Sequence, residues 1–356
     1  MMSSTSRWNG APRVLGALAV LAWLAGVAPG HTQANVEAVA NDTGPDRQRR
    51  LEDGARREGT LLLYTTGTQI KPLLDRFTQK YPFLKVELAR SSAADTARKV
   101  LEEYRAGYEK VDAFELASHG LVVPRDENIL QPFQSPELAA YDPDAIEPRR
   151  FWVVVRESYT GIGFNTTLLP ADQAPRTYQA LLDPRWKDRM SMSGVGTTAA
   201  NWVGTMVIAE GVDYVRKLGR QNIRVYNMTG RALANLMSSG EVGLSPTIYN
   251  SHVDASARKG APLAWIAPGP VPVTDTGVAL ARKAPHPHAA MLLIDFLMSK
   301  EGQLIYQELG YDSGRRDVAT SGAPVKKLYL SNRPKYIAEY EGWMKLYQDV
   351  FVRRRM

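Results

Sequence analysis

The chain has 356 residues, of which 44% are hydrophobic and 23% are charged, a balance typical of globular proteins. It contains no cysteine, which excludes thiol catalysis, zinc–thiolate sites, iron–sulfur clusters and disulfides. The formal net charge of +7 is spread along the chain and forms no basic stripe with interleaved aromatic residues, so nucleic-acid binding is not expected.

The first 34 residues have the three-part layout of a secretory signal peptide. Arg7 and Arg13 give a basic start without acidic residues, residues 14–27 are an unbroken run of apolar and small side chains, and residues 32–34 (Thr-Gln-Ala) offer a cleavage site. The apolar run is shorter than the roughly 20 residues needed to cross a bilayer. We therefore expect cleavage near residue 34 and a periplasmic location; an uncleaved membrane anchor or a buried helix is the alternative.

The next residues, 35–47, are polar and mixed in composition, which predicts a disordered linker before a charged helix over 49–58. Strand, helix, strand, helix and strand are then predicted over residues 61–64, 70–81, 84–88, 92–106 and 112–116. This alternation indicates parallel strands with right-handed crossovers, an α/β lobe whose ligands gather at the carboxyl ends of the strands.

A second α/β unit is expected after a strand over 151–155 and a glycine pair at Gly161 and Gly163. Its predicted helices span residues 198–210, 230–239 and 249–259, and its predicted strands span 242–244 and 276–280. A long helical region over 286–309 and a closing helix over 336–350 follow. Pro270 and Pro272 lie in a stretch that we interpret as a stiff connector.

Seven short stretches occur in an order that identifies a family. They are 58–66 (EGTLLLYTT), 77–82 (FTQKYP), 161–166 (GIGFNT), 182–187 (LDPRWK), 239–242 (SGEV), 284–287 (APHP) and 296–303 (FLMSKEGQ). Together they resemble the periplasmic solute-binding proteins of bacterial ABC importers, and the ferric-iron-binding type in particular.

This resemblance implies a two-lobed periplasmic-binding-protein fold of type II, with the ligand cleft between an α/β lobe of residues 48–164 plus 275–356 and a second lobe of residues 165–274. It also implies a monomer that delivers a small solute to an inner-membrane ABC permease, without a cofactor. A periplasmic sensor that signals to a membrane receptor is the alternative. No catalytic motif such as G-x-S-x-G, H-E-x-x-H or a Walker loop occurs, so an enzyme is not expected.

The sequence departs from the ferric pattern, which uses a histidine after the first strand, an acidic residue after the third and two adjacent tyrosines. Thr68 stands at the first position, Ala117 at the second with Glu115 nearby, and Tyr249 has no tyrosine neighbour. Ferric iron prefers anionic oxygen ligands, so we expect weak binding of the bare ion and no metal site. A ferric-ion transport protein stays open as the alternative.

Small hydroxyl residues precede several predicted helices, and helix N-termini attract anions. The resemblance matches Thr197, Thr198 and Thr229 to anion-contacting turns of the family. The candidate ligand contacts are Thr65, Thr66, Ser91, Ser92, Thr197, Thr198, Thr229, Tyr249 and Asn250. We expect a small anionic solute, namely an organic anion, a phosphonate or phosphate-type anion, or a metal chelate. The alternative for each hydroxyl is that it only caps its helix.

Overall fold

The computed structural model describes residues 35–67, 69–194, 196–319 and 326–354. The signal-peptide prediction for residues 1–34 lies outside these ranges. Within them, no helix is both long enough and apolar enough to cross a membrane.

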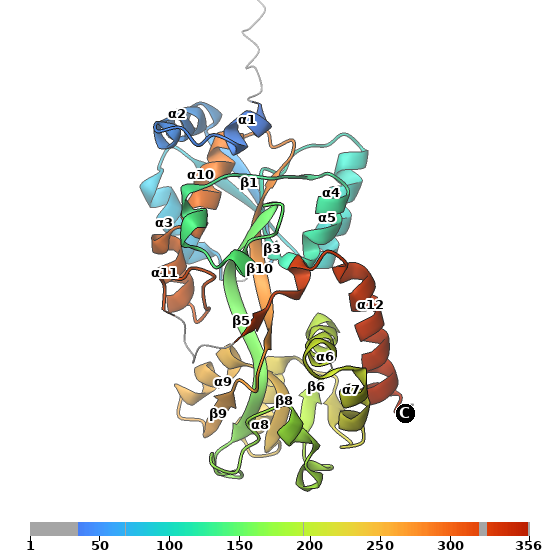
Figure 1. Ribbon diagram of the computed structural model, residues 1–356. Coiled ribbons are helices and arrows are strands. Elements are labelled where there is room, and N and C mark those ends of the chain that lie inside the picture. The colour runs from blue at the N-terminus through green and yellow to red at the C-terminus, as the bar shows by residue number, and fades with distance from the viewer. Residues whose placement is uncertain (1–34, 68, 195, 320–325, 355–356) are drawn as a thin grey trace, which may run out of the picture. The chain divides into compact units, whose positions relative to one another are not determined.

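The first α/β unit follows the order predicted from the sequence (Figure 1). It consists of α2 (Arg47–Glu58), β1 (Thr60–Thr65), α3 (Lys71–Lys80), β2 (Lys85–Arg90), α4 (Ala93–Arg105) and β3 (Ala113–Ala117). β1 pairs in parallel with both β2 and β3, which confirms the predicted parallel strands. Thr65 lies opposite Arg90 on one side and Glu115 on the other, so polar residues meet at the carboxyl ends of three adjacent strands.

The prediction of a disordered linker over 35–47 is wrong for its first part. Helix α1 (Val36–Ala40) begins there, and the Asn35 side chain caps it by accepting from the backbone N–H of Glu37 at 3.0 Å. Three of its five residues are buried, and its last carbonyl accepts from the backbone N–H of Gln134 at 2.8 Å. Residues 35–47 are polar on average, but Val36, Val39 and Ala40 form a short apolar pattern that is buried by tertiary packing.

Two long strands connect the first unit to the second. β5 (Trp152–Asn165) and β10 (Val271–Ala281) pair antiparallel along most of their length, and Figure 1 shows them side by side. The first part of β10 also pairs with β11 (Lys327–Leu328), and its last part pairs with β3 and with β4 (Leu130–Gln131). The far half of β5 pairs with the strands of the second unit, β8 (Leu244–Tyr249) and β9 (Leu263–Ile266).

The sequence analysis predicted two short strands and a connector here, because proline disfavours a central strand. Pro272 nevertheless lies within β10, at a position where β10 pairs only with the two-residue β11 and not yet with β5. Proline lacks a backbone N–H, so it is tolerated at such an edge position.

The second unit contains a two-stranded parallel sheet and several helices beside β8 and β9. These elements are β6 (Ser191–Ser193), α6 (Gly196–Glu210), α7 (Val212–Gly219), β7 (Arg224–Tyr226), α8 (Gly230–Ser238) and α9 (Asn250–Ala257). The remaining helices are α5 (Val122–Asp126), α10 (Pro287–Met298), α11 (Lys300–Glu308) and α12 (Tyr336–Tyr347). The single helical region predicted over 286–309 is therefore two helices, separated at Ser299.

The closing helix α12 belongs with the second unit, although the sequence analysis assigned residues 275–356 to the first lobe. The indole of Trp343 packs directly over Gly204 of α6, where an added Cβ would lie 2.5 Å from the ring. Phe351, just after α12, contacts Trp202 with ring centroids 5.6 Å apart. Aromatic side chains that fill glycine-lined contacts bring these distant segments together, which periodicity alone does not reveal.

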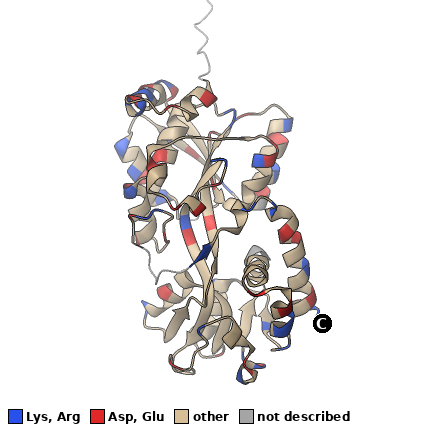
Figure 2. Cartoon of the chain, viewed as in Figure 1, with Lys and Arg blue, Asp and Glu red and all other residues tan. Residues whose placement is uncertain are grey.

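One face of the β5–β10 pair is buried and carries carboxylates, and Figure 2 shows the charged positions along the middle of these strands. Glu157 lies directly opposite Asp275 in the register. Glu157 accepts from the Tyr159 hydroxyl at 2.6 Å and forms an ion pair with Lys327 at 2.7 Å. Among the described residues, Asp275 has no cationic partner; it accepts from the Ser331 hydroxyl at 2.9 Å, and burial raises its pKa to about 6.

This raised pKa predicts a pH-dependent stability. The native state keeps the Asp275 carboxyl protonated at a pH where the unfolded chain has lost that proton, so the free energy of unfolding falls as the pH rises from about 4 through about 6. In the variant Asp275→Asn this loss disappears, a relative gain of about 3 kcal/mol at neutral pH. Urea unfolding across this pH range measures it.

The matched control is Asp213→Asn, because the Asp213 side chain is 81% exposed. It should leave a stability profile parallel to that of the parent protein. Parallel profiles for Asp275→Asn and the parent protein would contradict the prediction.

Candidate functional site

The other face of the β5–β10 pair is polar and partly open to solvent. Arg156 lies opposite Thr276, and Ser158 lies opposite Thr274. Because side chains alternate along a strand, these four residues share one face, which we call the strand-pair face. Arg156, Ser158 and Thr274 are half-buried, whereas Thr276 is buried.

Arg156 is held at one end of this face by Glu115 of β3. Its Nε donates to Glu115 Oε1 at 2.9 Å, and the Glu115 carboxylate, fully buried, also accepts from the Tyr306 hydroxyl at 3.4 Å and from the Thr65 hydroxyl. Within the described residues no protein group accepts a hydrogen bond from the two Nη atoms of Arg156. The pair therefore presents a fixed guanidinium fork with two free donor groups.

Tyr311 covers the flat side of this guanidinium. The Arg156 Cζ atom lies 4.9 Å from the centre of the Tyr311 ring, and the Tyr311 hydroxyl donates to Gln69 Oε1 at 3.0 Å, in the loop after β1. Stacking and hydrogen bonding leave Arg156 little rotational freedom. The orientation of the fork is thus set by residues from four separate segments.

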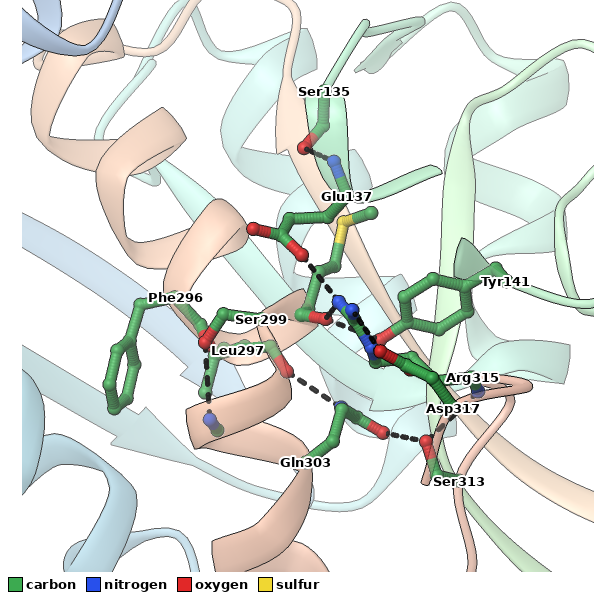
Figure 3. Close-up of polar contacts among 12 residues, drawn as sticks. Ser135, Glu137, Tyr141, Phe296, Leu297, Ser299, Gln303, Ser313, Arg315 and Asp317 are labelled. Atoms are coloured by element: carbon green, nitrogen blue, oxygen red, sulfur yellow. Dashed lines mark hydrogen bonds and ion pairs between the residues drawn. The ribbon is translucent and has the colours of Figure 1, made fainter. Parts of the chain in front are cut away.

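The loop that carries Tyr311 is anchored by a buried arginine (Figure 3). Arg315 donates from Nη1 to the Met298 carbonyl at 2.9 Å and to Glu137, and it binds Asp317 with Nε at 2.8 Å. Nearby, Ser299 caps α11 by accepting from the backbone N–H of Gly302 at 3.1 Å. This cluster explains why one long helix is interrupted and how the following loop is held against the sheet.

The opposite end of the strand-pair face is formed by neutral hydroxyl groups. The Tyr249 hydroxyl lies 2.6 Å from Thr198 Oγ1 and 3.1 Å from Thr274 Oγ1. Burial raises the pKa of Tyr249, so its phenol is protonated at neutral pH. The ring of His252 packs edge-on at 5.1 Å, and burial lowers its pKa to about 4, so this imidazole is neutral as well.

The structure describes the side chains of eight of the nine candidate residues, and they fall into three situations. Thr66, Thr198 and Tyr249 are half-buried at the two ends of the strand-pair face. Thr65 and Asn250 are buried and fully engaged: Thr65 with Glu115, and Asn250 with the Tyr159 backbone N–H (2.9 Å). The Thr197 side chain lies outside what the structure describes.

The remaining candidates form local hydrogen bonds at helix starts. Ser92 caps α4 by accepting from the backbone N–H of Asp95 at 3.1 Å, and Thr229 caps α8 by accepting from that of Ala232 at 3.3 Å. The Ser91 hydroxyl lies 2.6 Å from Thr96 Oγ1. All three candidates are exposed, and the contacts of Ser92 and Thr229 match the capping alternative considered for each.

Sequence reasoning did not identify Arg156, Thr274 or Tyr311 as site residues. The signal for Arg156 was present, because residues 152–158 (WVVVRES) place charges inside an otherwise apolar strand. Such charges inside a strand need a partner or a function. Glu115 was noted only as a departure from the ferric pattern, and its partnership with Arg156 depends on strand order.

A family model described as "Bacterial extracellular solute-binding protein" matches residues 123–326. The chain belongs to this family. It is also 24% identical over 288 residues to a Haemophilus influenzae protein named "Uncharacterized protein", an alignment that covers 74% of this chain and 79% of that protein. The family expected from the seven sequence stretches is confirmed.

Solved structures of such proteins share the fold. A Trichodesmium protein (IdiA, FutA) in complex with iron and citrate has a TM-score of 0.71 at 18% identity and covers 82% of this chain and 99% of its own. The periplasmic binding protein AfuA of Actinobacillus pleuropneumoniae, with fructose-6-phosphate bound, has a TM-score of 0.63 at 20% identity and covers 83% and 99%. The two-lobed α/β periplasmic-binding-protein fold is confirmed, and identities this low show the fold alone.

The capping role of Thr229 predicts a stability effect. The variant Thr229→Ala removes the hydroxyl that satisfies an N–H of α8, so the free energy of unfolding should fall by about 1 kcal/mol. The control Thr229→Ser keeps a capping hydroxyl and should stay close to the parent protein. Equal stability of all three proteins in urea unfolding would contradict the capping role.

Proposed function

We propose that this solute-binding protein captures a small anion on the strand-pair face and delivers it to an inner-membrane ABC permease. The observation that carries the proposal is the guanidinium of Arg156, whose Nε is held by Glu115 while both Nη atoms have no partner among the described residues. Carboxylates and phosphates match such a fork through two parallel hydrogen bonds.

The electrostatics favour recognition by geometry. Glu115 balances the charge of Arg156, so the pair is neutral and the anion is held by directed hydrogen bonds in a partly desolvated place. Glu115 accepts from three donors, Thr65, Arg156 and Tyr306, which compensate the charge of its buried carboxylate. Such a site selects anions by shape more than by net charge.

Of the sequence candidates, Thr66, Thr198 and Tyr249 are the ligand contacts in this proposal, together with Arg156. Thr65 and Asn250 position neighbouring groups, because their side chains are already engaged within the protein. Structural relatives bound to iron with citrate and to fructose-6-phosphate are consistent with anionic ligands on this fold.

The variant Arg156→Gln, combined with Glu115→Gln so that no buried carboxylate is left alone, should weaken anion binding at least about thirtyfold, the value of one charge-assisted hydrogen-bond pair. Isothermal titration with phosphate, phosphonates and carboxylates measures this. The control Arg98→Gln removes an arginine that is 67% exposed on α4 and should leave binding unchanged. Equal affinity of the double variant and the parent protein would overturn the proposal.

Bare ferric ion is the competing ligand, and the structure favours the anion. Ferric sites need anionic oxygens, whereas the Tyr249 phenol is neutral, and no cluster of three or more His, Asp or Glu residues suited to a metal occurs among the described residues. We expect no tyrosinate-to-iron absorption band when ferric iron is added to the metal-free protein. A strong band that disappears in Tyr249→Phe would refute this expectation.

A periplasmic sensor would use the same ligand site but a different membrane partner. Our proposal favours import because the family consists of solute-binding proteins. Reconstitution with the permease encoded nearest to this protein, followed by ligand-stimulated ATP hydrolysis, distinguishes the two roles.

A further inference from the structure

We propose that Asn250 and Asp312, two buried residues outside the set of ligand contacts, are positioning residues that couple the two ends of the strand-pair face. Their hydrogen bond links the start of α9, beside Tyr249, to the loop that carries Tyr311. This inference rests on the proposed function and adds how the two ends of the ligand site are held relative to each other.

The side-chain amide of Asn250 bridges two segments in one defined orientation. Its Oδ1 accepts from the Tyr159 backbone N–H of β5 at 2.9 Å, and its Nδ2 donates to Asp312 Oδ2 at 3.2 Å. A backbone N–H can only donate, so the amide oxygen must face Tyr159 and the amide nitrogen must face Asp312. Asn250 is 6% exposed and Asp312 is 3% exposed, so bulk water does not replace a partner that is lost.

The backbone of Asp312 is itself attached to β5. Its carbonyl accepts from the Glu157 N–H at 2.8 Å, and its N–H donates to the Glu157 carbonyl at 3.1 Å. Asn250 is attached to the same strand at Tyr159, so the two attachments lie on either side of Ser158, a residue of the strand-pair face. The bond between Asn250 and Asp312 therefore joins two segments that meet at one short stretch of β5.

Each of the two residues directly follows a tyrosine of the candidate site. Tyr249 precedes Asn250 and forms the neutral end of the strand-pair face, whereas Tyr311 precedes Asp312 and covers the guanidinium of Arg156 at 4.9 Å. Consecutive residues share a rigid peptide unit, so a displacement of Asn250 or Asp312 also displaces the neighbouring tyrosine. The hydrogen bond thereby makes the neutral end and the guanidinium end move together.

Isothermal titration of the purified full chain with inorganic phosphate, methylphosphonate and acetate tests the positioning role. Asn250→Asp places a carboxylate oxygen against Asp312 and should weaken the binding of these anions about tenfold. The double variant Asn250→Asp with Asp312→Asn exchanges donor and acceptor but keeps both hydrogen bonds of this side chain. It should return the affinity to within about threefold of the parent protein.

Two further variants control for added charge and for misfolding. Asn235→Asp adds the same charge at an exposed position of α8 and should leave the affinity unchanged. Asn250→Ser is too short to reach Asp312, so it removes the donor without adding a charge and should also weaken binding about tenfold. This variant decides the test if Asn250→Asp does not fold.

A double-mutant cycle distinguishes coupling from a purely structural role. In the parent protein, the combined loss of affinity in Tyr249→Phe with Tyr311→Phe should differ from the product of the two single losses by at least about threefold. In the Asn250→Ser background the two losses should simply multiply. A purely structural role would lower the stability of Asn250→Ser and leave the coupling factor as in the parent protein.

A measurement without ligand separates this inference from the proposed function. The chain has no cysteine, so spin labels at Glu102→Cys on α4 and Lys217→Cys on α7, both exposed, report the distance between the two units. Asn250→Ser should broaden the distribution of this distance, and the exchange of Asn250 and Asp312 should keep it narrow.

Each outcome decides one of the two proposals. If no anion binds but the distribution broadens, the proposed function fails and the coupling of the two units stands. If anions bind Asn250→Ser as tightly as the parent protein, the positioning role is refuted and the proposed function stands. An unchanged distance distribution refutes the coupling in either case.

Discussion

The antiparallel pairing of β5 with β10 is the constraint on which the rest of the structure depends. β10 pairs with β3 of the first unit and β5 pairs with β8 of the second, so the register between β5 and β10 links the two units and fixes which of their residues face solvent. Arg156 and Thr274 occupy the partly open face, while Glu157 and Asp275 occupy the buried one. Because the side-chain period is two, a slip of one residue would bury Arg156 and expose the carboxylates.

The buried pair of Glu115 and Arg156 is best understood as a positioning device. Desolvation offsets much of the Coulombic attraction in such a pair, so the pair adds little to the free energy of unfolding. Its main consequence is that the guanidinium has a fixed orientation. Glu115 fixes Nε, Tyr311 fixes the plane, and Arg315 anchors the loop that carries Tyr311. These three residues thereby set the orientation of the Arg156 guanidinium.

Shared architecture is what relates this chain to its structural neighbours. The fold is common to proteins solved with iron and citrate and with a sugar phosphate, at identities near 20%. In this chain burial raises the pKa of Tyr249 and lowers that of His252 to about 4, so both side chains are uncharged at neutral pH. The fold fixes where a ligand binds, and a few side chains decide which ligand it is.

The sequence by itself determined the α/β class, the order of β1, α3, β2, α4 and β3, the family and three of the residues proposed to touch the ligand, because local periodicity and short motifs carry that information. Tertiary structure decided the rest. Arg156 and Glu115 are 41 residues apart, and Thr198 and Tyr249 are 51 apart. Whether Thr65 binds a ligand or Glu115, and whether Ser92 caps a helix, likewise depends on three-dimensional neighbours. Contacts between distant segments arise from strand order and packing, which no local pattern encodes.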